Sequence, residues 1–520
     1  MLFNSYPFLF GFLPLVLVGY FILGRKNCLV AAAWLAFASL FFYAWWNPAY
    51  LGLLLASIGI NFFFAETIAR YRARGRFTQS RYWLIIALTA NLALLGYYKY
   101  ADFFRASFHQ LTGISTPALD IVLPLGISFF TFTQIAFLVD THRGTVRESS
   151  FIHYLLFVTY FPHLVAGPVL HHQEMMPQFR SRSVYQPQWE NLAVGLSIFL
   201  IGLYKKTVLA DGVAEYVGPV FTAAAQAQNG GPSLTLLEAW GGALAYSLQI
   251  YFDFSAYSDM AIGLSRLFGI QLPINFNSPY KATSIIEFWR RWHITLSRFL
   301  RDYLYIALGG NRRGRLRRHA NLFMTMVLGG LWHGAGWTFV AWGALHGAYL
   351  MINHTWSHLR QRWGEPWPGE RFLAQWLTFI AVVVAWVFFR SPDFATAVHL
   401  LTAMVGGNGL ILPDTWVARW GSFGYWLGEQ GLMSAPLVHF NTTQFNWLWL
   451  LLMVCWLMPN TQQVMATYRP GLVSPGYGAI VPTERLGWSP SLFWLLLLGL
   501  VGGYALLCIP EFTEFIYFQF

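Results

Sequence analysis

Apolar stretches with little or no charge recur along almost the whole chain, and they limit most strongly what it can fold into. A helix that crosses a membrane needs about 20 mostly apolar residues. Stretches close to this length cover residues 7–24, 28–46, 49–68, 82–100, 118–139, 152–170, 190–210, 234–252, 321–352, 373–389, 444–459 and 490–509. We expect about 11–13 membrane segments, some re-entrant where proline or polar residues interrupt the stretch. The predicted fold class is therefore an all-α, polytopic integral membrane protein.

The scarcity of charge excludes most other classes. Only 11% of the 520 residues are charged, against roughly 25% in soluble proteins, so soluble domains could not cover their surfaces. Three cysteines scattered through apolar stretches, Cys28, Cys455 and Cys508, do not form a disulfide framework. Basic residues of membrane proteins gather in cytoplasmic loops and contact anionic lipid, so the net charge of +11 predicts no nucleic-acid partner.

The basic loops also predict orientation. Arg25 and Lys26 follow the first apolar stretch, and five arginines lie between residues 70 and 81, two crossings later. Both loops are typical of the cytoplasmic side, which places the N-terminus outside. The first 24 residues lack a basic start and a small-residue cleavage site, so we expect a retained first helix. Residues 391–440 are predicted to be a large extramembrane loop, and residues 441–520 the C-terminal membrane helices.

The central part of the chain predicts an amphipathic helix. Ser284 to Glu287 fits a capping box, and the apolar positions 285, 289, 292, 296, 299 and 303 lie on one helical face. Such a helix lies at a membrane surface. His293 falls at the boundary between its buried and wet faces. Arginines follow closely, at positions 290, 291, 298, 301, 312, 313, 315, 317 and 318, which favours the cytoplasmic side.

His333 is the strongest candidate for chemistry. If the stretch after Asn321 begins at the cytoplasmic surface, His333 lies about 18 Å deeper, near the middle of the membrane core. A protonatable group there is a functional-site hypothesis by default. The glycines that flank it let a ligand or a neighbouring helix approach closely. The alternative is a neutral histidine that hydrogen-bonds between helices, and the same two interpretations apply with less force to His346.

Other polar groups in apolar surroundings are less specific. Asp253 and Asp259 either bind substrate hydroxyls or pair with a buried arginine. The segment Phe161 to Pro168 resembles a re-entrant turn, where His163 either lines a cavity or serves the structure. Trp45, Trp46, Trp367, Tyr97 and Tyr98 are typical of interface belts and core.

Several soluble-type catalytic motifs are missing from the sequence. It contains no G-x-x-x-x-G-K-[ST], so an ATP-driven pump is unsupported. It contains no G-x-S-x-G and no H-E-x-x-H, which argues against a serine hydrolase elbow and against that zinc site. We predict no metal, and we expect any chemistry to come from polar groups held inside the membrane.

Six motifs in order resemble the membrane-bound O-acyltransferase (MBOAT) family, in the bacterial branch that contains the alginate O-acetyltransferase membrane subunit and the D-alanyl transferase of teichoic acids. They are Tyr251-Phe252-Asp253-Phe254-Ser255, Asn275-Phe276-Asn277-Ser278-Pro279-Tyr280, Phe288-Trp289-Arg290-Arg291-Trp292-His293-Ile294-Thr295-Leu296-Ser297, Arg301-Asp302-Tyr303-Leu304-Tyr305, Leu308-Gly309-Gly310-Asn311-Arg312 and Gly330-Leu331-Trp332-His333-Gly334-Ala335. The resemblance covers roughly residues 1–390, which we take as the acyltransferase core. The Gly-Gly-Asn-Arg stretch and the chain length favour the alginate type.

The resemblance implies both a fold and a site. The family fold is a ring of tilted helices around a thin centre with a tunnel. Its catalytic histidine falls on His333, and its second polar position falls on His293. We expect the substrate-binding residues to be Asn277, Tyr280, Trp289, Arg290, Arg291, Asp253 and Trp332.

The expected reaction is acyl transfer from a thioester to a hydroxyl. Burial favours the neutral form of His333, which can then take the hydroxyl proton, while His293 orients the donor. The arginines between 290 and 318 attract an anionic cytoplasmic donor, acetyl-CoA or an acyl carrier protein, so no bound cofactor is expected. The resemblance implies a bacterial inner membrane, a periplasmic serine-dependent esterase-like partner and an exported polysaccharide as acceptor.

Three alternatives stay open at this point. In the first, the acceptor is peptidoglycan. In the second, the transferred group is D-alanine destined for teichoic acid. A protein of another class, a transporter with His333 as a proton relay, would leave acyl donors intact. The sequence does not name the acceptor, the direct donor or the oligomeric state.

Overall fold

The computed structural model describes residues 1–510, except 147–149, 166, 232, 363–364, 366, 475, 478–479 and 484–485. Nearly all the regular structure in these ranges is helical, which confirms the predicted all-α class. The one sheet in the described ranges pairs two three-residue parallel strands, β1 (Ile411–Pro413) and β2 (Met433–Ala435). Residues 511–520, the end of the predicted C-terminal region, lie outside the described part.

Five helical stretches in the described ranges are long and apolar enough to cross a membrane: Pro7–Lys26, Ala49–Ala73, Phe77–Thr112, Trp189–Gln226 and Glu370–Arg390. Four shorter apolar helices accompany them: α2 (Cys28–Ala44), α19 (Phe394–Met404), α22 (Thr442–Leu457) and α24 (Leu492–Leu507). Because several of these helices must cross in turn, the chain is a multi-pass membrane protein.

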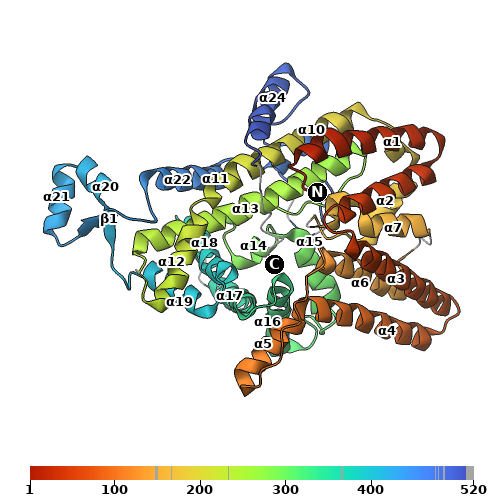
Figure 1. Cartoon of the computed structure of the whole chain (residues 1–520), viewed down its shortest axis with the longest axis horizontal. Coiled ribbons are helices and arrows are strands. Elements are labelled where there is room, and N and C mark those ends of the chain that lie inside the picture. The colour runs from red at the N-terminus through yellow and green to blue at the C-terminus, as the bar shows by residue number, and fades with distance from the viewer. Residues whose placement is uncertain are drawn as a thin grey trace.

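The N-terminal third of the chain forms a bundle of tilted helices (Figure 1). These are η1 (Pro7–Phe12), α1 (Leu13–Lys26), α2, α3 (Ala49–Ala73), α4 (Phe77–Leu95), η2 (Gly96–Tyr100), α5 (Ala101–Thr112), α6 (Ile127–Arg143), α7 (Phe151–Thr159), α8 (Phe161–Leu164), α9 (His172–Arg180) and η3 (Arg182–Tyr185). Two predicted spans are shorter than expected. The 118–139 stretch is irregular until Gly126, whose φ of +69° begins α6, and the 152–170 stretch breaks at Tyr160, ahead of Pro162, which has no N–H to donate.

The long helix α13 (Leu236–Leu267) forms the centre of the molecule. Of its 32 residues 27 are buried, among them the charged Asp253, Asp259 and Arg266, so the helix is enclosed by protein on nearly all sides. Its start is fixed by the capping box of Thr235 and Glu238. It packs along α10 (Trp189–Tyr204), where Gly195 and Gly263 bring the two backbones so close that an added Cβ would come within 2.7 Å of the other backbone. The chain joins them through η4 (Lys205–Ala210), α11 (Asp211–Ala214), α12 (Val217–Gln226) and η5 (Ala227–Asn229).

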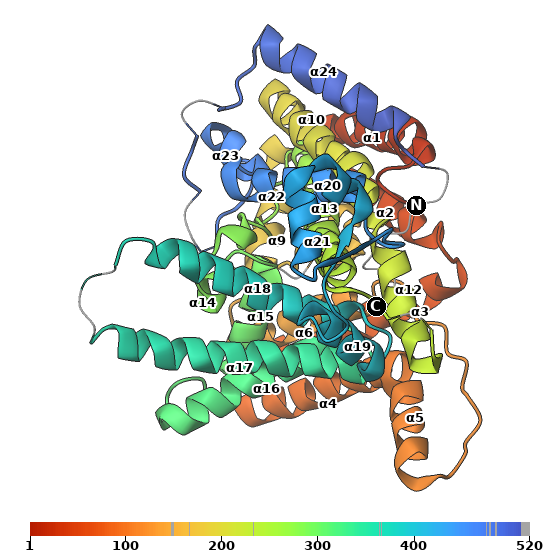
Figure 2. The ribbon, with the colours of Figure 1, turned by 90° about the vertical axis from the view of Figure 1, so that its left-hand side faces the viewer.

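The central motifs form a broken segment and a helical hairpin. The elements are η6 (Pro279–Lys281), α14 (Ile285–Trp289), α15 (Ile294–Phe299), η7 (Leu300–Tyr305), α16 (Gly314–His333), α17 (Trp337–Arg360) and α18 (Glu370–Arg390). The prediction that residues 321–352 hold a broken helix is confirmed: α16 and α17 lie side by side (Figure 2) with the break at 334–336. His319 and His354 approach to 6.5 Å between ring centroids, so the hairpin returns to the face where it began.

Contacts between basic loops define one face of the molecule. Arg25 and Lys26 line a pocket with Arg182, while Arg143 donates to the backbone oxygen of Asp302, close to the start of α16. We call this the arginine-rich face. Its cytoplasmic orientation stays a prediction.

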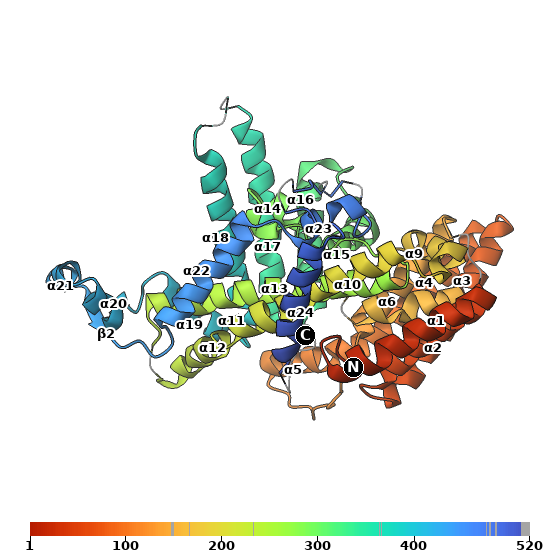
Figure 3. The same ribbon diagram turned by 90° about the horizontal axis from the view of Figure 1, so that it is seen from above.

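After α18 and α19 the chain forms an arm and a strap. The arm, residues 405–440, carries β1, α20 (Asp414–Arg419), α21 (Ser422–Glu429) and β2, and it projects from the body (Figures 1 and 3). The predicted loop 391–440 therefore begins with helix α19, and its place outside the membrane stays a prediction. The C-terminal strap, residues 458–474, follows α22 and includes α23 (Thr461–Val464) and η8 (Ala466–Tyr468).

The strap covers the central motifs. Asn460 donates to Asn277 and Ser278 at 2.9 and 2.8 Å. Further along, Ser474 accepts a hydrogen bond from Arg298. Sequence reasoning predicted the helices on either side of the strap but not the strap itself.

Candidate active site

His333 is the last residue of α16, at the inner end of the hairpin. Its side chain is buried, with 5% of the residue exposed. Gly330 and Gly343 allow the two helices to touch, because a Cβ on Gly330 would lie 2.2 Å from the backbone oxygen of Phe339. The glycines near His333 therefore serve the approach of a neighbouring helix, one of the two predicted uses.

His293 is fully buried, which corrects its predicted place at a helix boundary. The single helix predicted over 285–303 is also wrong. The chain leaves α14 after Trp289, and His293 takes left-handed backbone angles (φ +42°, ψ +54°) before α15 begins. The cause is a long-range contact: the N–H of Ile294 donates to the backbone oxygen of Asn275 at 3.0 Å and is lost to the helix. This break turns the imidazole inward.

Hydrogen bonds around Asn275 fix the state of the His293 ring. The Oδ1 atom of Asn275 receives the backbone N–H of Thr295 at 3.2 Å and the Thr295 hydroxyl at 2.9 Å. That hydroxyl in turn accepts the N–H of Val169 at 2.9 Å. Because Oδ1 acts here only as an acceptor, His293 Nδ1, at 3.2 Å, must be the protonated nitrogen. Nε2 of His293 then carries the lone pair.

The structure brings the two predicted histidines together. The ring centroids of His293 and His333 lie 6.5 Å apart. Trp332 contacts both rings, at 4.8 Å from His333 and 6.2 Å from His293. Trp342 lies 5.0 Å from His333 on one side and 4.8 Å from His346 on the other. Trp289 then donates its indole N–H to His346 Nδ1 at 3.3 Å. His346 thus belongs to the same aromatic cluster.

A pocket of about 120 Å³ connects His333 to the far side of the molecule from the arginine-rich face. Its other lining residues are Trp46, Lys99, Leu123, Pro124, Leu125, Gly126, Ile127, Ser128, Phe129, Val165 and Trp332. Helix α2 starts beside Arg25 and Lys26 and has 17 residues, which gives a length of about 26 Å. Trp46 follows its far end, so the pocket opens opposite the basic loops.

The other predicted substrate-binding residues lie in separate surroundings. Asp253 is buried and pairs with Lys206 at 2.7 Å, so the buried partner foreseen for it is a lysine and not an arginine. Asn277 accepts from the strap, and the hydroxyl of buried Tyr280 donates to the backbone oxygen of Ser247.

The two arginines of the central motif also differ from each other. Arg290 is exposed. Arg291 is held by Glu287 through two hydrogen bonds, of 2.7 and 3.1 Å. Burial raises the pKa of Glu287, but hydrogen bonds from Thr283 and the charge of Arg291 outweigh it and leave the pKa below its usual value. Substrate roles for these residues stay predictions.

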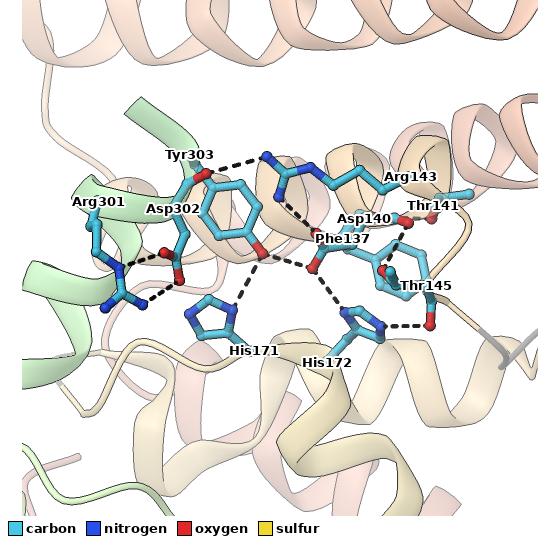
Figure 4. Close-up of polar contacts among 10 residues, drawn as sticks. All are labelled: Phe137, Asp140, Thr141, Arg143, Thr145, His171, His172, Arg301, Asp302 and Tyr303. Atoms are coloured by element: carbon cyan, nitrogen blue, oxygen red, sulfur yellow. Dashed lines mark hydrogen bonds and ion pairs between the residues drawn. The ribbon is translucent and has the colours of Figure 1, made fainter. Parts of the chain in front are cut away.

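A polar network ties the Arg-Asp-Tyr motif to the helices around it (Figure 4). Asp140 accepts from Tyr303 at 2.7 Å and lies 3.2 Å from His172 Nδ1. Tyr303 also meets His171 Nδ1 at 3.3 Å, and Arg143 stacks over its ring. This network holds η7 against α6 and α9 on the arginine-rich face.

Sequence reasoning missed Asn275, Thr295, Trp342 and Lys99 as parts of the site. Of these, only Lys99 left a clear signal, because it is a charge near the end of the apolar stretch 82–100. His163, which was left open, bonds through Nε2 to the backbone oxygen of Phe157 at 2.8 Å and serves the structure; Ala166 in the same segment lies outside the described residues. Within the described ranges no three His, Cys, Asp or Glu side chains gather as metal ligands.

The described helices are those of a multi-pass membrane protein, and they enclose a buried pair of histidines. The chain belongs to the membrane-bound O-acyltransferase family, whose model matches residues 140–391 and so includes both histidines. It is therefore an acyltransferase, as its resemblance implied.

Named relatives cover most or all of the chain. It is 46% identical to the peptidoglycan O-acetyltransferase of Helicobacter pylori, over 79% of this chain and 81% of that protein. It is 37% identical to the probable alginate O-acetylase AlgI of Pseudomonas aeruginosa, over the full length of both. Similarity to the teichoic acid D-alanyltransferase of Streptococcus thermophilus is lower, 27% over 65% of this chain and 92% of that protein.

Proposed function

We propose that this protein is an O-acetyltransferase that passes an acetyl group from a cytoplasmic thioester across the membrane toward an exported polysaccharide. The observation that carries the proposal is the placement of His333: it lies 6.5 Å from His293 inside the protein and lines a pocket that opens opposite the arginine-rich face. A group delivered from one side can therefore be reached by an acceptor from the other.

In this proposal His333 acts as the general base. It takes the proton of the acceptor hydroxyl while the oxygen attacks the thioester carbonyl; the C–S bond then breaks and the thiol leaves with the proton. His293 has its lone pair on Nε2, so it is suited to accept an N–H from the donor's amide-containing arm. With this tautomer, His293 orients the donor by accepting a hydrogen bond from it, as the expectation that it orients the donor allows.

The exposed arginines and the relatives also bear on the donor and the partners. Exposed arginines such as Arg290, Arg313 and Arg317 suit a polyanionic donor, acetyl-CoA or an acyl carrier protein, which acts as a substrate and not as a bound cofactor. We propose residence in a bacterial inner membrane and transfer to a periplasmic serine-dependent partner. Family membership sets aside the transporter alternative. The relative from Helicobacter pylori supports peptidoglycan as a second candidate acceptor, and the weaker match supports D-alanyl transfer less.

The test is His333→Ala in proteoliposomes supplied with acetyl-CoA on the arginine-rich side and with a hydroxyl-bearing acceptor, polysaccharide or peptidoglycan fragments, on the other side. We expect release of free CoA to fall by about 10²- to 10⁴-fold, the range for loss of a general base, at normal protein level. His358→Ala, at an exposed position on α17, is the matched control and should keep wild-type turnover. Normal turnover of His333→Ala would refute the proposal. Polysaccharide and peptidoglycan fragments supplied separately then identify the acceptor.

A further inference from the structure

The last carbonyl groups of α16 receive hydrogen bonds from a distant part of the chain. The last four carbonyls of a helix have no partner within the helix. Beyond His333 the backbone is extended at Gly334 and again at Gly336, both at φ −160° and ψ +149°, so the N–H of the C-cap residue Gly334 does not close the last turn of the helix. Trp332 and His333 are buried and Leu331 is half-buried, so the carbonyls of these residues need donors from other parts of the chain.

Two consecutive residues of η2 supply these donors. Tyr100 donates its hydroxyl to Leu331 O at 2.9 Å. Lys99 donates from Nζ to Trp332 O at 2.5 Å and to His333 O at 3.4 Å. A third contact, at 3.3 Å, joins Lys99 to the hydroxyl of Ser128. Because an ammonium group has three N–H donors, these contacts use all of them.

The charge of Lys99 suits this task. A lysine within an apolar membrane stretch is costly, and such residues usually serve a function. The C-terminal end of a helix carries a partial negative charge that a cation stabilises. Lys99 also lines the His333 pocket and lies 6.0 Å over the Trp332 ring. Lys99 therefore binds the last turn of α16, which carries His333.

We propose that Lys99 is a positioning residue that holds the imidazole of His333 toward His293 and the outer pocket. With its three N–H groups engaged, it acts through the backbone of residues 332 and 333 and does not bind the acceptor itself. This inference rests on the proposed function only for its effect on turnover. The geometric effect on His333 does not depend on that function.

The kinetic test compares Lys99→Met with Lys99→Arg. We expect Lys99→Met to lower kcat for acetyl-CoA by about 100-fold, the order that a misplacement of about 1 Å can cost, with KM changed by less than about twofold. Arginine keeps a cation and N–H donors, so it should recover part of kcat. The matched control is Lys205→Met, at a half-buried lysine that pairs with Asp259 away from the site, and it should keep kcat per folded molecule. A rise in KM with kcat unchanged would overturn the proposal in favour of direct substrate binding.

A second readout needs no activity. In a background without Cys28, Cys455 and Cys508, His333→Cys is labelled with a small charged methanethiosulfonate reagent. We expect Lys99→Met to raise the labelling rate at least fivefold because the last turn of α16 is released, whereas Lys205→Met leaves it unchanged.

Two outcomes are decisive. An unchanged labelling rate overturns the proposal, even where turnover is lost. If Lys99→Met does not fold, Tyr100→Phe removes one bond of the same cap, and the rate should rise less but in the same direction; no change there refutes the cap.

Discussion

Replacement of Asn275 by alanine should separate stability from chemistry at His293. The amide oxygen of Asn275 accepts three hydrogen bonds, two from Thr295 and one from His293. At about 0.5–1.5 kcal/mol each, their loss should destabilise the protein by about 1.5–4.5 kcal/mol. Only the bond from His293 fixes the tautomer. Its loss lets the other tautomer compete and should lower turnover by about 2- to 13-fold, the factor that corresponds to 0.5–1.5 kcal/mol.

Thr295→Val is the matched control. It removes the hydroxyl that bridges Val169 and Asn275 but leaves the bond between Asn275 and His293 intact. We therefore expect a loss of stability with turnover per folded molecule within about twofold of wild type.

Unfolding can be followed with a thiol-reactive dye, because Cys455 is 6% exposed in the folded protein and reacts when the fold opens. Turnover is measured as CoA release at a temperature where each variant is folded. Two results would refute the reasoning: full turnover of Asn275→Ala, or a loss in Thr295→Val as large as in Asn275→Ala.

Two further predictions concern orientation and the indole beside His333. Arg317→Cys should react with an impermeant thiol reagent only from the cytoplasmic side. Arg317 is a better labelling site than the nearby Gly314, because Gly314 has φ +83°, which a cysteine rarely adopts. Reaction from the periplasmic side would invert the proposed direction of transfer. Trp342→Phe removes a buried indole N–H that has no hydrogen-bond partner among the described residues, so no hydrogen bond is lost. The smaller ring leaves a cavity in the aromatic cluster, and we expect some loss of thermal stability. Turnover per folded molecule should fall by about 10²-fold if that N–H stabilises the acyl oxyanion; wild-type turnover would exclude this use of the N–H.

Local sequence patterns predicted the helical class and the break in the hairpin. The Gly334-Ala335-Gly336 stretch lies within an uncharged run too long for one crossing, so two pieces were foreseeable from length alone. His333 stood out because a protonatable side chain deep in an apolar run is costly. These features depend on neighbours in the chain, which is why the sequence alone revealed them.

The burial of His293 depends on distant residues, and its position on a helix boundary was predicted wrongly. The apolar spacing of 285–303 fits one helix, and all its apolar positions except the half-buried Tyr303 are indeed buried. Yet hydrogen bonds between Ile294 and Asn275 and between Arg291 and Asn277 outweigh the helical alternative and turn His293 inward. The cap on α16 likewise comes from Lys99, more than 230 residues earlier. No local periodicity encodes such pairings.

The C-terminal strap has a consequence for the order in which the protein is made. Arg298 meets Ser474 across 176 residues of sequence, and Asn277 meets Asn460 across 183. When the ribosome has translated both histidines, it has not yet translated the strap. Both histidines are therefore made before the segment that hydrogen-bonds the motifs beside them, and these contacts form only after residue 474 has been translated.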